Sequence, residues 1–447
     1  MKSVTRKKLR YRRHCLENDL VLLLFEKHRL PLVSIGAFVL AGLDQNPPDR
    51  PGIAALTSRM LEEGTQNHEV HEIAEIIEGS GGGLTTFGER ELSGISLFTR
   101  SEDLHTALEL LREMLVCPIF PEDRFKLENE KVLSRLQAMD DDPQVVAASR
   151  FNRWIYQGSP LQYPILGTQE SVRQLQVNEL KEFHLQKYAP QNTILVIVGA
   201  IDGDDALAHV AEQFSDWRNP GFYRREISGF RQQTEPFLDE YFMDKEQITI
   251  FLGHLGVARD NPDYHTLQVM DVILGSGPGF TSRIPGKLRD EQGLAYSTYS
   301  DISGSSGIYP GCFMAFVSTS PENKQKALDG LLFEIENLVE NGVTCEELAA
   351  AQDFLTGNFV FEFQSNVSVA RFLLATELFE LGEDYPEQYP QIIRAIDCDD
   401  VSRVARRYLD TLNYTTVVVG PTHDDKPRNR SKLPPSPSGQ TRDTSSN

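Results

Sequence analysis

Apolar residues recur with two different periods along the chain, and the two periods predict strands and helices. Continuous apolar runs at residues 20–25 and 32–43 predict two buried strands joined by a polar turn. Residues 51–65 carry apolar side chains at steps of three and four between a Pro-Gly start and a Gly-Thr end, which predicts an amphipathic helix. The same reasoning predicts strands at 84–87, 92–98 and 192–199, and helices at 68–77, 104–115, 145–156, 177–187 and from residue 125 onward.

The second half of the chain repeats this order after a polar segment at residues 217–236, which we interpret as a linker. Near the end of each half, at residues 187–199 and 407–420, a basic residue and a tyrosine precede an asparagine, and a glycine follows the asparagine by seven residues. This match, at an offset of about 220 residues, indicates an internal duplication. The elements predicted for this half are strands at 248–252, 295–300 and 311–317, helices at 264–274 and 321–340, and a glycine-rich turn at 275–279.

Strands grouped in hairpins and helices in separate runs predict an α+β fold. We expect two homologous halves, each with a largely antiparallel sheet that helices cover on one face. The N-terminal domain is predicted over residues 1–220 and the C-terminal domain over residues 237–420. Residues 421–447 contain almost no apolar side chains, so we expect a disordered tail there.

The length and net charge of the chain constrain the number of domains and the kind of partner. A chain of 447 residues is too long for one hydrophobic core, which agrees with two domains. The net charge of −21 disfavours nucleic-acid binding, because that function needs a basic face. We therefore expect no nucleic-acid partner.

Cysteine usage and hydropathy predict a cytoplasmic protein. The five cysteines are scattered and form no Cys-x-x-Cys pair, as expected for free thiols in a reducing compartment. No apolar run is long enough to span a bilayer, so no membrane association is expected. The first sixteen residues are basic, as in an organellar presequence, but strand-like sequence begins almost at once.

The helix predicted at residues 51–65 carries the first candidate chemistry. Its Pro-Gly start, its length, Met60 and its Gly-Thr end resemble the active-site helix of the insulinase-like (pitrilysin, inverzincin) metallopeptidases. In that family the helix carries His-x-x-Glu-His, in which the two histidines bind zinc and the glutamate is the general base for the zinc-bound water. The matching positions in this chain are Ala55, Ser58 and Arg59.

These substitutions remove the zinc chemistry that the resemblance would otherwise imply. Ala55 has no donor atom, Ser58 has a neutral hydroxyl that is a poor base near pH 7, and Arg59 is protonated and has no lone pair. The family's third ligand, a Glu roughly 75 residues further along, corresponds to Arg135, and the Glu seven residues earlier is retained as Glu128. We therefore predict no catalytic residue, metal or other cofactor in this chain. The two arginines are expected side by side, with their charge balanced by an ion pair to Glu128 or by a bound anion.

One constellation of the family's second half is retained. Residues 287–297, Lys-Leu-Arg-Asp-Glu-Gln-Gly-Leu-Ala-Tyr-Ser, resemble the family's C-terminal-half signature. In that signature an Arg and a Tyr seven residues apart reach into the active site, hold the substrate backbone and help to stabilise the tetrahedral oxyanion. Arg289 and Tyr296 have this spacing, and a guanidinium fork and a directional hydroxyl suit the role. The resemblance therefore implies that these two residues bind substrate.

A retained Arg/Tyr pair beside a degenerate zinc motif has a meaning in this family. Some members of this size are heterodimers, in which one chain carries His-x-x-Glu-His with zinc and the other supplies the Arg and Tyr. We predict that this chain is the second kind, a non-catalytic, substrate-binding subunit that pairs with a catalytic paralogue and acts on extended, unfolded peptides.

Three alternatives stay open. One is a structural or peptide-binding family member with no role in proteolysis, which would have no need for the Arg/Tyr pair. Another is an active peptidase that uses a different metal site, for which the ten histidines offer no evident ligand set. A homodimer of this chain is the third.

Overall fold

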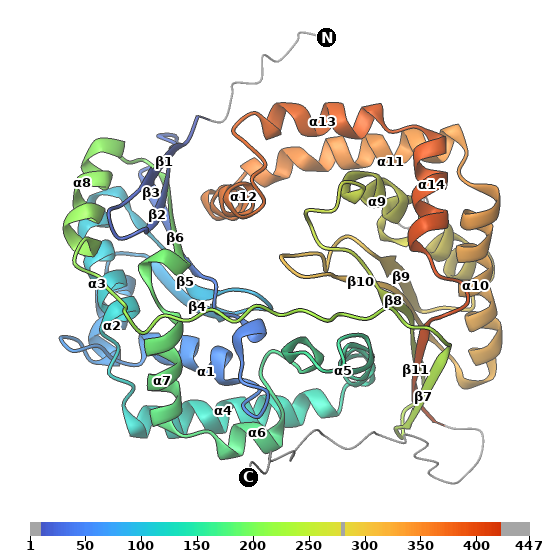
Figure 1. The fold of residues 1–447 in the computed structure, drawn as a ribbon, viewed down its shortest axis with the longest axis horizontal. Helices are drawn as coiled ribbons and strands as arrows, with labels where there is room; N and C mark the ends of the chain where they lie inside the picture. Colours follow the sequence, from blue (N-terminus) through green and yellow to red (C-terminus); the bar gives the residue numbers. More distant parts are fainter. Residues whose placement is uncertain (1–9, 279–281, 422–447) are drawn as a thin grey trace, which may run out of the picture.

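Two β-sheets, one in each half of the molecule, form the framework of the fold (Figure 1). The computed structural model describes residues 10–278 and 282–421. The first sheet has the strand order β1 (Arg12–Cys15), β2 (Val21–Glu26), β6 (Thr193–Gly199), β3 (Leu32–Val39), β5 (Ser93–Arg100) and β4 (Gly83–Gly88). The second sheet has the order β7 (Phe237–Phe242), β11 (Thr415–Gly420), β8 (Ile248–Leu255), β10 (Cys312–Thr319) and β9 (Ser297–Asp301).

The two sheets share one topology. Strands β2, β6, β3, β5 and β4 correspond in order to β7, β11, β8, β10 and β9, and β1 is an addition at the edge of the first sheet. In each sheet one pair is parallel, β2 with β6 and β7 with β11, and the other pairs are antiparallel. The α+β prediction of two similar halves with largely antiparallel sheets is thus confirmed.

The outer face of each sheet is covered by helices from the same half of the chain (Figure 1). Leu22 and Leu24 of β2 belong to the same apolar core as Leu111 of α3, whereas Leu23 belongs to the cluster on the opposite face, as the two-residue period of a strand requires. The helices of the first half are α1 (Ile53–Arg59), α2 (Val70–Gly79), α3 (Leu104–Val116), α4 (Glu122–Asp140), α5 (Pro143–Ile155), α6 (Gln169–Gln174), α7 (Val177–Lys187) and α8 (Gly203–Phe214). Those of the second half are α9 (Tyr264–Asp271), α10 (Lys324–Asn341), α11 (Cys345–Asn358), α12 (Asn366–Leu378), α13 (Tyr385–Ala395) and α14 (Cys398–Tyr408).

The inner face of each sheet is covered by a helix from the other half (Figure 1). Helix α5 packs on β8 and β11, where the rings of Phe151 and Phe251 lie 6.0 Å apart between centroids. Helix α12 packs on β6 and β3, where Leu373 and Val196 share one apolar cluster. Each of these helices is the third α-helix after the strand pair β4–β5 or β9–β10, so the exchange is reciprocal. The expectation that helices cover one face of each sheet is therefore incomplete.

Residues 215–236 connect the two halves without a helix or strand, as the linker prediction requires. Two polar side chains of the first half fix this segment. The Lys187 ammonium donates to the carbonyl of Tyr223 (2.6 Å), and the Gln45 amide exchanges hydrogen bonds with the backbone of Arg225 (2.8 and 3.0 Å). The linker is thus tied to the first half, and the domain boundaries at residues 220 and 237 stay predictions.

Asp44, next to Gln45, makes folding stability depend on pH. Burial raises the pKa of Asp44 to about 7, although its Oδ2 accepts a hydrogen bond from the Gln45 side chain (2.7 Å). Because the folded pKa lies above the unfolded one, folding disfavours the ionised form, and the stability cost grows as the pH rises from about 4 to about 7. At pH 8, Asp44→Asn should therefore raise the free energy of unfolding by on the order of 2 kcal/mol, with a difference that vanishes near pH 4.

Urea unfolding at pH 4, 6 and 8 measures this difference. Asp49→Asn is the matched control, because the Asp49 side chain is 72% exposed and should give no such pH-dependent gain. A gain at Asp44 that is the same at all three pH values would contradict the assignment.

The structure corrects several predicted elements. The helix predicted at residues 51–65 ends early, because α1 stops at Arg59 and a 3-10 turn follows at Met60–Glu62. Strand β7 does not fit an apolar strand pattern, since Asp239 occupies a buried position in it. Helices α6, α8 and α11 to α14 also have no counterpart in the prediction. The tail predicted at residues 421–447 lies outside the described residues beyond Pro421, as does Gly279 of the predicted glycine-rich turn.

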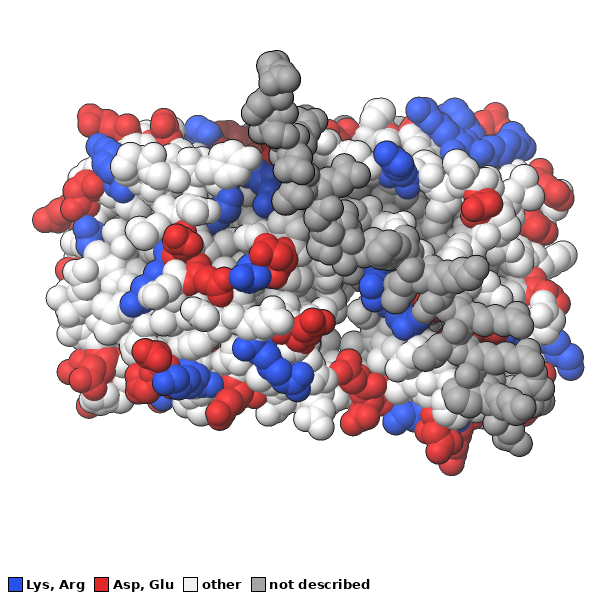
Figure 2. All heavy atoms as spheres, turned by 60° about the horizontal axis from the view of Figure 1, so that its bottom comes forward, with Lys and Arg blue, Asp and Glu red and all other residues white. Residues whose placement is uncertain are grey.

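Lys and Arg side chains are interspersed with Asp and Glu on the face drawn in Figure 2. That face therefore carries mixed charge rather than the continuous basic stripe typical of nucleic-acid binding. None of the helices in the described ranges combines the length and the apolar composition that a bilayer crossing requires.

Candidate functional site

Helix α1 lies close against strand β4, and this contact positions two of the degenerate residues. The helix starts after Gly52, whose φ of 94° is in the left-handed region that glycine adopts without strain. Gly88 of β4 faces the helix, because a Cβ on Gly88 would lie only 2.8 Å from the Cα of Ala55. Ala55 is 4% exposed, and Ser58 is fully buried. The Ser58 hydroxyl is enclosed in the protein interior and has no hydrogen-bond partner within the described residues.

A cavity of about 1030 Å³ adjoins α1, α4, α5 and the edge strands β4 and β9. Ala55, Arg59 and Arg135 all line this cavity, so three of the four degenerate positions face one space. Sequence reasoning missed the rest of the wall, because its residues come from segments far apart in the chain. Among them are Phe151, Tyr156, Phe251, Tyr299 and Met314.

Glu128 is the acidic partner of Arg59, as expected. Its Oε2 lies 3.7 Å from Nη1 of Arg59, and its Oε1 accepts a hydrogen bond from the Lys131 ammonium (2.6 Å). The Glu128 side chain is only 6% exposed, so this carboxylate is buried between two cations. The Arg135 side chain makes no hydrogen bond or ion pair to any residue in the described part of the chain. Arg135 is exposed to solvent and is one of the residues that line the cavity.

Glu62, in the 3-10 turn after α1, is a second carboxyl group near Arg59. Burial raises its pKa above the usual value, whereas a hydrogen bond from the Thr86 hydroxyl (3.0 Å) and the charge of Arg59 act in the opposite direction. The sequence could have suggested this role for Glu62 only through its position three residues after Arg59, which places both on the same side of a helical turn. The ion-pair partner of Arg59 is thus Glu128, and Glu62 is a further acidic group whose pKa the charge of Arg59 influences.

The predicted substrate-binding pair lies outside the residues that line this cavity. Arg289 belongs to η7, a π-helical segment at Pro285–Glu291, and Tyr296 directly precedes β9. The Arg289 side chain is 37% exposed and bonds the adjacent Asp290 (Nε to Oδ1, 2.8 Å), and Tyr296 is 67% exposed. The backbone N–H of Tyr296 donates to the carbonyl of Ser318 (2.9 Å), so the main chain is fixed while the ring faces solvent.

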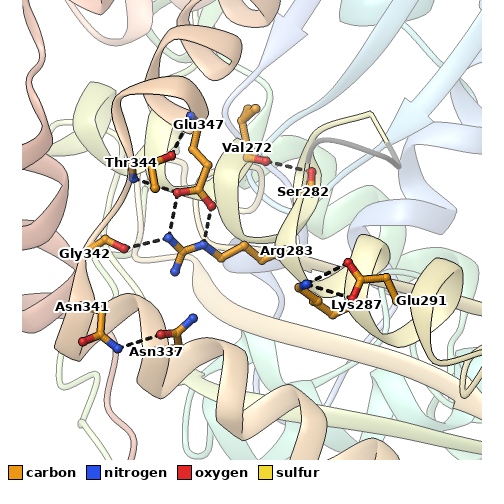
Figure 3. Close-up of polar contacts among 10 residues, drawn as sticks. All are labelled: Val272, Ser282, Arg283, Lys287, Glu291, Asn337, Asn341, Gly342, Thr344 and Glu347. Carbon is orange, nitrogen blue, oxygen red and sulfur yellow. Dashed lines mark hydrogen bonds and ion pairs between the residues drawn. The ribbon is translucent and has the colours of Figure 1, made fainter.

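The segment η7 is anchored to the body of the second half by Arg283, two residues before its start (Figure 3). The Arg283 guanidinium donates to both carboxylate oxygens of Glu347 (2.7 and 2.9 Å) and to the carbonyl of Gly342 (2.7 Å). Glu347 also accepts the backbone N–H of Thr344 (2.8 Å), which caps helix α11. Leu288, inside η7, is fully buried. These contacts give Arg289 a rigid base.

Sequence comparison assigns both halves to one family. Residues 21–169 match the family model described as "Insulinase (Peptidase family M16)", and residues 174–355 match the model described as "Peptidase M16 inactive domain". The chain belongs to the insulinase family, peptidase family M16.

Relatives in the M16 family match over most of their length. An uncharacterized zinc protease of Mycobacterium tuberculosis is 26% identical over 397 residues, which cover 87% of this chain and 88% of the relative. An uncharacterized zinc protease of Bacillus subtilis is 23% identical and covers 92% of this chain and 98% of its own. A crystal structure of a peptidase M16 inactive domain from Pseudomonas fluorescens has a TM-score of 0.87 and 25% identity, and the match covers 94% of this chain and all of that one. The M16 fold thus extends over nearly the whole chain.

Zinc is the metal to test against the side chains, because these M16 relatives are named zinc proteases. Protein zinc sites are built from Cys, His, Asp and Glu. Ala55, Arg59 and Arg135 offer no lone pair and Ser58 is enclosed, so zinc does not fit the residues at the four family positions. Over residues 10–278 and 282–421, no three His, Cys, Asp or Glu side chains are grouped in a way that could hold a metal ion.

Proposed function

We propose that this chain is a non-catalytic subunit of an M16 zinc peptidase. In this proposal it supplies Arg289 and Tyr296 to the active site of a partner chain that carries His-x-x-Glu-His and zinc, and the pair cleaves extended, unfolded peptides. The chain itself holds no cofactor. A cytoplasmic location belongs to the same proposal, since the scattered cysteines are typical of a reducing compartment.

One observation carries the proposal: Arg289 and Tyr296 are exposed on a rigid support and do not line the cavity of this chain. The partner of Arg289 is its neighbour Asp290, on the surface. A surface ion pair of this kind contributes about 1 kcal/mol or less, so a substrate carbonyl in a protein interface can replace it. The Tyr296 hydroxyl is likewise available to a second chain.

The residues at the degenerate zinc positions also support the proposal that this chain is a non-catalytic subunit. Where an M16 peptidase has two histidines and a glutamate as zinc ligands, this chain has Ala55, Arg59 and Arg135 on the cavity wall, and its general-base position is an enclosed serine. A chain with this site cannot activate water through zinc, whereas the retained pair is useful only beside a site that can. The two facts together favour a catalytic paralogue as the partner.

Reconstitution with the His-x-x-Glu-His paralogue from the same genome tests the proposal. We expect the two chains to co-purify, and cleavage of a quenched, unstructured peptide to require both. A variant of the partner with Glu→Gln in His-x-x-Glu-His should assemble equally well and abolish cleavage. Cleavage by the partner alone at the rate of the pair, or no complex between the chains, would contradict the proposal and favour a structural or peptide-binding role.

A further inference from the structure

We propose that the cavity at the degenerate zinc positions is a binding site for the C-terminal carboxylate of an extended peptide, with Arg135 as the main anion-binding group and Arg59 as a second cation on the same cavity wall. The inference concerns this chain by itself. It needs neither a partner nor proteolysis, so it stands or fails separately from the role proposed for Arg289 and Tyr296.

Several charged residues line the cavity, and three of them already interact with other groups of the protein. Glu89 is paired with Arg371 (3.0 Å), and the Asp142 carboxylate accepts backbone N–H groups at the start of α5. Arg90 donates to the Tyr156 hydroxyl (2.9 Å) and to a backbone carbonyl (2.6 Å). These three side chains are already engaged in holding the fold together. Of the cationic side chains on the wall, this leaves Arg59 and Arg135 for an anionic ligand, whereas the carboxylates of Glu89 and Asp142 are exposed.

Arg135 is the one of these two arginines that has no protein partner within the described residues, and it is exposed to solvent. Arg59 lies 3.7 Å from the Glu128 carboxylate, which is closer to Lys131, whereas Arg135 has no partner within the described residues. Both residues line the same cavity. A carboxylate is the matching ligand, because a guanidinium offers a planar fork of donors that fits two oxygens at once.

The remaining wall selects the kind of carboxylate. Phe151, Phe251, Met314 and Ile165 line the same cavity as the arginines. An inorganic anion would gain nothing from these apolar groups. The last residue of a peptide carries a carboxylate and an apolar side chain within a few ångströms of each other, so it can satisfy both parts. A volume of about 1030 Å³ is at the upper end of ligand cavities and accommodates more than one residue.

Fluorescence anisotropy on the full chain alone tests the inference. The probe is a peptide with apolar residues, fluorescein-Gly-Ala-Leu-Ala-Phe, with a free C-terminal carboxylate. A second form ends in an amide, and a third ends in an amide but carries Glu in place of the central Leu. We expect the free acid to bind about tenfold or more tightly than both amides, with an affinity that falls as salt rises.

Variants assign the effect to the arginines. Arg135→Gln should remove most of the difference between acid and amide, and Arg59→Gln should remove a smaller part, because Arg59 already has acidic neighbours. Arg173→Gln is the matched control, since Arg173 is exposed on α6, where it bonds Gln169 (2.8 Å), and does not line the cavity. Circular dichroism of each variant checks that the fold is unchanged.

Three results would overturn the inference. They are equal affinity for acid and amide, an acid preference that survives Arg135→Gln, and no binding of any probe at millimolar concentration. Tight binding of the internal-Glu amide would overturn the assignment to a chain terminus and leave a general carboxylate site.

Discussion

Replacing Arg289 with alanine in the complex with a His-x-x-Glu-His partner is expected to lower kcat for peptide cleavage by about 10²–10³-fold. The reason is that one preorganised donor to a developing oxyanion is worth a factor of this size. Arg289 is held ready for the role by η7, whose base is fixed by the Arg283–Glu347 pair (2.7 Å), and truncation removes the guanidinium without disturbing that support. The loss should appear in kcat rather than in assembly, as followed by steady-state kinetics and size-exclusion chromatography.

Tyr296→Phe separates the hydroxyl from the ring. It should lower kcat by a factor of about 10 or more, since it removes a single hydrogen bond and keeps the shape of the side chain. Arg173→Ala, at an exposed site on α6, is the control that should leave both kinetics and assembly unchanged. A complex that assembles normally and cleaves at the wild-type rate with both substitutions at Arg289 and Tyr296 would show that the retained pair has no part in proteolysis.

The degenerate site could be anticipated from the sequence because it rests on local patterns. The Pro-Gly start fixes the register of α1, and the helical period then places Ala55 and Arg59 on neighbouring turns. The pairing of Arg59 with Glu128 also followed from family spacing, and the two groups lie 3.7 Å apart. Two homologous halves were likewise visible, since a repeated motif at a fixed offset needs no knowledge of packing.

The walls of the cavity could not be anticipated, because they depend on contacts between distant segments. Helix α5 follows α4 directly in the sequence, yet it packs on the sheet of the other half. Nothing in its apolar stripe specifies which sheet that stripe covers. The same holds for Phe251 and Met314, which reach the cavity from the second sheet. Ser58 shows a further limit: its residue type was known, but its full burial depends on the packing of α1.

Strand β7 was not predicted from the sequence, and the reason has an energetic consequence. Its buried residue is Asp239, which is 1% exposed and accepts two hydrogen bonds from the Arg150 guanidinium (2.7 and 2.9 Å) and one from the Trp154 indole N–H (2.9 Å). Arg150 and Trp154 lie on α5, so this cluster joins a helix of the first half to a strand of the second.

Asp239→Ala is therefore expected to lower the free energy of unfolding by about 3–5 kcal/mol, because it leaves the half-buried Arg150 guanidinium without its counter-charge. Chemical denaturation followed by circular dichroism measures the loss. Glu240→Ala is the matched control from the adjacent position, since Glu240 forms a surface pair with Lys324 and its removal should cost about 1 kcal/mol or less.

The shape of the unfolding transition shows whether this cluster couples the two halves. If the cluster couples the halves, the Asp239 variant should also broaden the transition or split it in two, because each half has its own core and the exchanged helix α5 would be held less firmly. A loss below 1 kcal/mol with a single sharp transition would mean that the apolar contacts of α5, led by Phe151 against Phe251, are enough to join the halves without the buried charge pair.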